Sequence, residues 1–68
     1  MSLRNHLTQH RKTHGLTQAD LAAAVGVSRK TINTVENNVF VPSTILALRL
    51  AQALDTTVET LFELEDEA

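Results

Sequence analysis

The spacing of apolar positions between residues 17 and 37 predicts two short helices joined by a tight turn. Leu21, Ala22 and Val25 form one inward stripe at helical spacing. Ile32 and Val35, three residues apart, form a second stripe. The positions around this second stripe are polar, which indicates a helix with one face on the core and the other turned to solvent.

The residues that flank these stripes are typical of helix boundaries. Thr17 and Asp20, three residues apart, match a capping box and predict that the first of the two helices begins at Thr17. Gly26 accepts the positive φ that often follows a helix end, so we expect the turn there. Ser28 is a suitable cap for the next helix. We expect that helix to close at Asn37 and Asn38, because asparagine tolerates the left-handed conformation.

Three further helices are predicted around this pair. We expect the first from Ser2 to about Thr13, the fourth from the Ser43 cap to about Leu54, and the last from the Thr57 cap through VETLFEL. Their inward residues are expected to be Leu3, Leu7, Ala47, Leu50, Ala51, Leu54, Val58, Leu61 and Phe62. Residues 1–68 should therefore form one small all-α domain of five helices, with an acidic tail over about residues 63–68.

The outward positions of the predicted third helix suit contact with DNA bases. They are Arg29, Lys30, Thr31, Asn33 and Thr34. Arginine can donate two hydrogen bonds to a guanine edge, and asparagine can pair with an adenine edge. Arg29 and Lys30 are the first candidates for base contact, and the other three are candidates of second rank.

The stretch from Gln18 to Asn37 resembles the helix-turn-helix of phage repressor and Cro proteins, the Xre-type transcriptional regulators. The matching positions are Gln18, Leu21, Ala22, Val25, Gly26, Val27, Ser28, Ile32, Val35 and Glu36. This resemblance implies a lambda-repressor-like fold in which the third helix enters the major groove of double-stranded DNA. The phosphate or backbone contacts that we expect are Gln18, Ser28 and Asn37, although the cap role alone explains Ser28.

The resemblance also implies a structural ion pair between Arg11 and Glu36. The alternative is that these are two unrelated surface charges. The chain departs from the family at Val39, where a lysine or arginine often meets phosphate.

The net charge of −2 hides an uneven distribution. Residues 1–36 carry five basic side chains against two carboxylates, whereas residues 37–68 carry one arginine against six carboxylates. We therefore expect the basic half to face DNA and non-specific affinity to be modest. Base contacts and dimerisation would then supply more of the binding.

One such module reads few base pairs, so we expect a homodimer on a palindromic operator, acting as a repressor. The candidate dimer residues are Phe40, Ile45, Leu48, Phe62 and Leu64. Two alternatives stay open: an antitoxin that holds a small protein partner, and a protein-interaction module that uses the same fold without DNA.

Several classes of protein and site are not expected. The absence of cysteine excludes disulfides and thiolate metal sites. His6, His10 and His14 follow one another at helical spacing, but no carboxylate or thiol nearby completes a site, so we expect no metal and no cofactor. No nucleophile–base arrangement indicates an enzyme. No signal peptide or membrane span is evident, so a cytoplasmic protein is expected.

Overall fold

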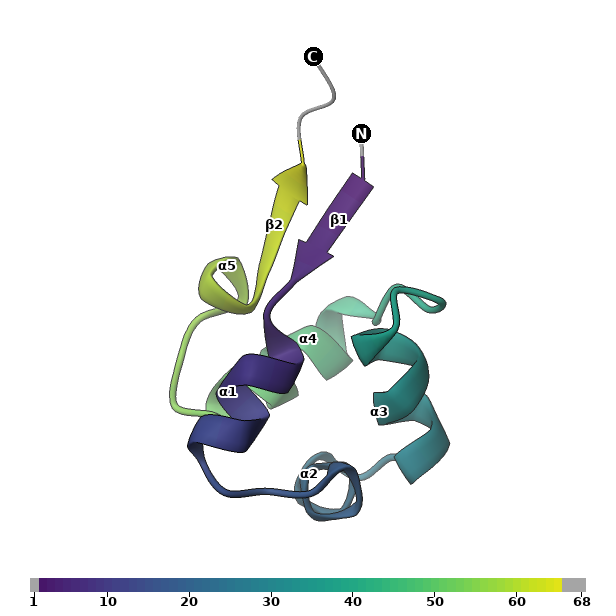
Figure 1. Ribbon diagram of the computed structural model, residues 1–68, viewed down its shortest axis with the longest axis vertical. Coiled ribbons are helices and arrows are strands. Elements are labelled where there is room, and N and C mark those ends of the chain that lie inside the picture. Colours follow the sequence, from purple (N-terminus) through teal and green to yellow (C-terminus); the bar gives the residue numbers. More distant parts are fainter. Residues whose placement is uncertain (1, 66–68) are drawn as a thin grey trace.

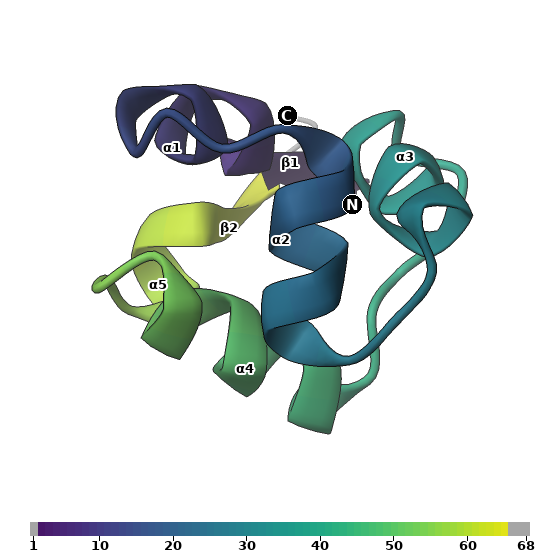
Figure 2. The same ribbon diagram turned by 90° about the horizontal axis from the view of Figure 1, so that it is seen from below.

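The computed structural model describes residues 2–65 and contains five helices and a two-stranded antiparallel sheet (Figure 1). The helices are α1 (Leu7–Thr13), α2 (Gln18–Val25), α3 (Arg29–Glu36), α4 (Thr44–Ala53) and α5 (Val58–Leu61). The strands are β1 (Ser2–Asn5) and β2 (Phe62–Glu65). Viewed from below, α2 lies between α1 and α3, with α4 packed against it (Figure 2).

Four of the five predicted helix starts are confirmed by their caps. Thr17, Ser28, Ser43 and Thr57 each accept a hydrogen bond from the backbone N–H three residues on. At Thr17 the capping box is complete, because Asp20 also accepts from the Thr17 backbone N–H at 3.0 Å. These hydroxyls satisfy N–H groups that have no partner inside the helix, which sets where each helix begins.

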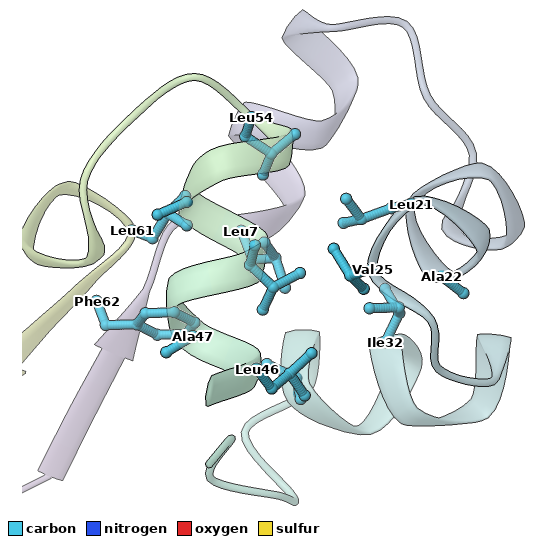
Figure 3. Close-up of a cluster of buried hydrophobic side chains, with 13 residues drawn as sticks. Leu7, Leu21, Ala22, Val25, Ile32, Leu46, Ala47, Leu54, Leu61 and Phe62 are labelled. Atoms are coloured by element: carbon cyan, nitrogen blue, oxygen red, sulfur yellow. The ribbon is translucent and has the colours of Figure 1, made fainter. Parts of the chain in front are cut away.

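The core lies between the five helices, each of which contributes side chains to one cluster (Figure 3). It consists of Leu7, Leu21, Ala22, Val25, Ile32, Val35, Leu46, Ala47, Leu50, Ala51, Leu54, Leu61 and Phe62. The residues predicted to face inward are in this set apart from Leu3 and Val58, which are half-buried and pack against it. Helix α3 contributes Ile32 and Val35 to this core.

The prediction of a purely helical fold was wrong at both ends of the chain. The segment expected to open the first helix is β1, and helix α1 begins only at Leu7. Helix α5 ends at Leu61, and the segment expected to complete it, from Phe62 onward, is strand β2. The two strands pair with Leu3 opposite Leu64 and Asn5 opposite Phe62, so segments from opposite ends of the sequence satisfy each other's backbone groups.

The ribbon formed by β1 and β2 projects from the helical body (Figure 1). Its outer face carries a charged cluster in which Arg4 pairs with Glu63 at 3.7 Å and with Glu65. Residues 63–65 of the predicted acidic tail belong to strand β2, and residues 66–68 of that tail lie outside the described residues. Arg4 is engaged by these carboxylates and does not add to a DNA-facing charge.

Candidate nucleic-acid interface

The turn between α2 and α3 is held by backbone geometry and by small side chains. Gly26 has φ +77°, the left-handed conformation expected for a residue after a helix end. The Val27 backbone N–H then donates to the Ala22 carbonyl oxygen at 3.0 Å, which closes the turn. Ala22 is buried and, with only a methyl group, lets α3 pack closely on α2.

Helix α3 has one buried face and one open face. Ile32 and Val35 expose 0% and 1% of their surface, while Arg29 and Lys30 in its first turn are exposed. Among residues 2–65, no carboxylate forms an ion pair with either of these cations. The first turn of α3 therefore presents two free positive side chains to solvent, as the outward positions in the sequence predicted.

The other predicted base readers are partly buried and bonded to one another. The Thr31 and Ser28 hydroxyls lie 3.0 Å apart, and the Thr34 hydroxyl donates to the Thr31 carbonyl oxygen at 2.9 Å. The Asn37 side-chain amide nitrogen donates to Asn33 Oδ1. These contacts hold the polar side chains along α3 in a defined arrangement.

The Arg11–Glu36 ion pair is present and nearly buried. Arg11 Nε donates to Glu36 Oε2 at 2.7 Å and Arg11 Nη2 donates to Oε1 at 3.3 Å. Arg11 Nη1 also donates to the Leu16 carbonyl oxygen at 2.8 Å. One guanidinium therefore ties α1, the loop before α2 and the end of α3 together, and fixes the angle at which α3 leaves the body.

Gln18 joins this network from the first turn of α2. Its side-chain amide donates to Glu36 Oε1 at 3.0 Å, so the residue predicted to touch phosphate also supports the ion pair. Burial alone would raise the pKa of Glu36, but the hydrogen bonds from Arg11 and Gln18 outweigh it and leave that pKa lowered. The carboxylate is thus held in its charged form.

Asn5 is a positioning residue that the sequence analysis missed. Its amide nitrogen donates to the Val35 carbonyl oxygen at 3.1 Å and to Asn38 Oδ1 at 2.7 Å. It therefore caps the carboxyl end of α3 from β1, while Asn38 takes the positive φ of +60° expected there. No local pattern marks this role, because Asn5 and α3 are about thirty residues apart.

Of the candidate dimer residues, four are exposed and one is buried. Ile45, Leu48 and Leu64 expose 65%, 54% and 69% of their surface, and Phe40 exposes 47%. Phe62 exposes only 8% of its surface because strand β2 turns it into the core, so it is the one candidate that is not an exposed side chain. Leu64, two residues on, has the same strand face but lies beyond the body.

The histidine array does not form a ligand cluster in the described residues. His6 precedes α1, and its Nε2 lies 3.0 Å from Glu63 Oε1 on the ribbon. Within residues 2–65, no three ligating side chains come together to hold a metal ion. None of the described helices is long and apolar enough to cross a membrane.

Residues 7–61 match a family model described as helix-turn-helix. An HTH-type transcriptional regulator of Methanothermobacter thermautotrophicus is 44% identical over 66 residues, covering 96% of each chain. The HTH-type transcriptional regulator MJ0272 of Methanocaldococcus jannaschii is 40% identical over 65 residues, covering 96% of this chain and 98% of that protein.

Solved structures show the same fold. SinR, the master regulator for biofilm formation, in complex with DNA superposes with a TM-score of 0.74 at 29% identity, covering 79% of this chain and 87% of that chain. A chain of the complex between the SinR and SinI proteins gives 0.75 at 29% identity, covering 79% of this chain and 53% of that chain. Relatives of this kind are transcriptional regulators rather than enzymes. The family match over residues 7–61, the two relatives and the geometry of the turn at Gly26 all indicate the same family. The chain belongs to the Xre-type, Cro-like helix-turn-helix transcriptional regulators.

Proposed function

We propose that this regulator is a repressor that binds a palindromic operator in double-stranded DNA as a homodimer. The observation that carries the proposal is the two-faced helix α3, with Ile32 and Val35 buried and Arg29 and Lys30 exposed in its first turn. A helix of this form fits the major groove with its amino end toward the base edges.

The roles proposed for individual side chains follow from their chemistry. Arg29 would make a bidentate contact with guanine, and Lys30 a less directional contact beside it. Thr31, Asn33 and Thr34 would contact base edges further along α3. Gln18, Ser28 and Asn37 would meet phosphates, Gln18 together with the amino end of α2.

The balance of charge favours binding through few phosphate contacts. Arg4 and Arg11 are engaged by carboxylates, which leaves Arg29 and Lys30 as the cations of the α3 face. Because each neutralised phosphate steepens the salt dependence of binding, we expect a shallow dependence for this protein. Base contacts and dimerisation then account for most of the specific affinity.

The proposed dimer surface is an apolar groove next to the ribbon. It is lined by Leu3, Val41, Pro42, Thr44, Ala47, Leu48, Val58 and Phe62. Leu64 projects from the end of β2 with 69% of its surface exposed and could enter this groove on a second copy. Such a contact is reciprocal under two-fold symmetry, and Ile45 would extend it.

Selection of bound fragments from random duplex DNA tests the proposal. We expect a consensus of two inverted half-sites about one helical turn apart. Sedimentation should show a dimer that Leu48→Ser dissociates without unfolding, since Leu48 exposes 54% of its surface. A pool that gains no consensus would contradict the DNA-binding role, and a monomer bound to a single half-site would contradict the dimer.

A second candidate function is an antitoxin or another role in which a small protein is the partner. It is favoured by the exposed apolar side chains of Val41 and Leu48, which line the groove next to the ribbon, and SinR, which shares the fold, has been solved in complex with SinI. Purification of the protein from its host at low salt separates the two. A stoichiometric second protein supports the antitoxin, and its absence from a DNA-binding dimer supports the repressor.

A further inference from the structure

An apolar notch lies directly beside the outward face of α3. It is lined by Lys30, Thr31 and Thr34 of the helix and by Val39 and Phe40 of the loop that follows. Val39 exposes 77% of its surface and Phe40 exposes 47%. The three helix residues are proposed base readers, whereas Val39 and Phe40 have purely hydrocarbon side chains.

The loop side of the notch is fixed in register with the helix. The positive φ of Asn38 turns the chain back, and the Val39 and Phe40 backbone N–H groups both donate to the Thr34 carbonyl oxygen, at 2.9 and 3.2 Å. The two apolar side chains therefore keep one position relative to Thr34. A ligand that contacts Lys30 and Thr34, one helical turn apart, meets Val39 and Phe40 in the same event.

The chemistry of the notch distinguishes between groups on DNA. Phosphate oxygens need a donor or a cation, and neither Val39 nor Phe40 has a polar side chain. The apolar group that DNA presents in the major groove is the C5 methyl of thymine, and apolar or threonine side chains contact it. Lys30 at the rim favours a polyanion over an uncharged protein surface.

We propose that this notch binds the methyl group of a thymine next to the base that Lys30 contacts, and that Val39 is a specificity-determining residue. The inference rests on the proposed DNA binding and adds one position to what the protein reads. Apolar surface that would otherwise face water beside α3 is covered when a thymine occupies the site.

Uracil substitution tests the inference, because uracil keeps the base pair and the O4 acceptor and lacks only the methyl group. Each thymine of the selected operator is replaced singly by uracil, and affinity is measured by fluorescence anisotropy. At one position in each half-site we expect about fourfold weaker binding, the value of one buried methyl group. That penalty should disappear in Val39→Ala and persist in Val41→Ala.

Val41 is a matched control because it has the same side chain in the same loop and exposes 72% of its surface, yet it does not line the notch. It lines the proposed dimer groove, so the compared quantity is the ratio of the affinities for the thymine and uracil operators within each variant, which a general loss of dimer affinity leaves unchanged. A selected operator without a uracil-sensitive position overturns this inference and leaves the proposed function standing. A penalty that persists in Val39→Ala, or a Val39→Ala effect on dimer dissociation alone, also overturns it. A protein that selects no DNA overturns both.

Discussion

Replacement of Arg11 by methionine, Arg11→Met, would remove the charge that ties α1 to the end of α3 while keeping much of the side-chain stem. The Arg11 side chain is 11% exposed and that of Glu36 is 5% exposed. The change would delete both hydrogen bonds to the Glu36 carboxylate and the bond to the Leu16 carbonyl oxygen. Gln18 would remain as the one side-chain amide that donates to that carboxylate.

The expected loss in the free energy of unfolding is about 3–5 kcal/mol, because a buried carboxylate is left without its cation. Small domains have total stabilities near the lower end of about 5–15 kcal/mol, so the variant should be close to unfolding at room temperature. The double variant Arg11→Met, Glu36→Leu should recover most of the loss, since an apolar pair replaces the buried charges.

Urea unfolding followed by circular dichroism measures both quantities. Arg4→Met is the control, because Arg4 forms an ion pair on the exposed outer face of the ribbon and its loss should hardly move the unfolding midpoint. The reasoning is refuted if Arg11→Met shifts the midpoint no further than Arg4→Met does. A double variant less stable than Arg11→Met alone would also refute it.

Three further predictions concern stability. Because the pKa of Glu36 is lowered in the folded protein, its contribution to the free energy of unfolding is present above its ordinary pKa of 4.5. That contribution is lost as the pH falls through the lower pKa of the folded state. Urea midpoints should therefore drop in acid less steeply for Glu36→Gln than for wild type. Gly26→Ala should cost about 1–2 kcal/mol in urea unfolding from backbone strain alone, since the added Cβ would meet only Arg49 Nη1, at 3.7 Å. Phe62→Ala should cost about 3–5 kcal/mol, whereas Leu64→Ala in the same assay should leave the unfolding of a dissociated monomer unchanged.

The local signals in the sequence predicted the helix-turn-helix because each acts over a few residues. The caps Thr17 and Ser28 bond to N–H groups three residues away, and Gly26 supplies its own φ. The stripes from Leu21 to Val35 need only helical geometry to point inward. Pattern and structure therefore agree over the whole segment that positions Arg29 and Lys30.

The ribbon could not be predicted in the same way because its partners are far apart in the sequence. Leu3 and Leu7 are four residues apart, which fits a helix, and only pairing with residues 62–65 makes the first segment a strand. The alternation of Phe62, Glu63, Leu64 and Glu65 is a strand signal, but it spans just four residues. The same non-local pairing brings Asn5 to the end of α3, beyond the reach of any local pattern.

Binding of Arg29→Ala to the selected operator and to random duplex DNA, at one salt concentration, tests most directly whether the open face of α3 reads bases. The account predicts a loss of about 1–3 kcal/mol on the operator, with relaxed preference at one base pair and a smaller change on random DNA. Gln18→Ala, by comparison, should weaken binding to both alike. Equal losses for Arg29→Ala on both DNAs would contradict the account.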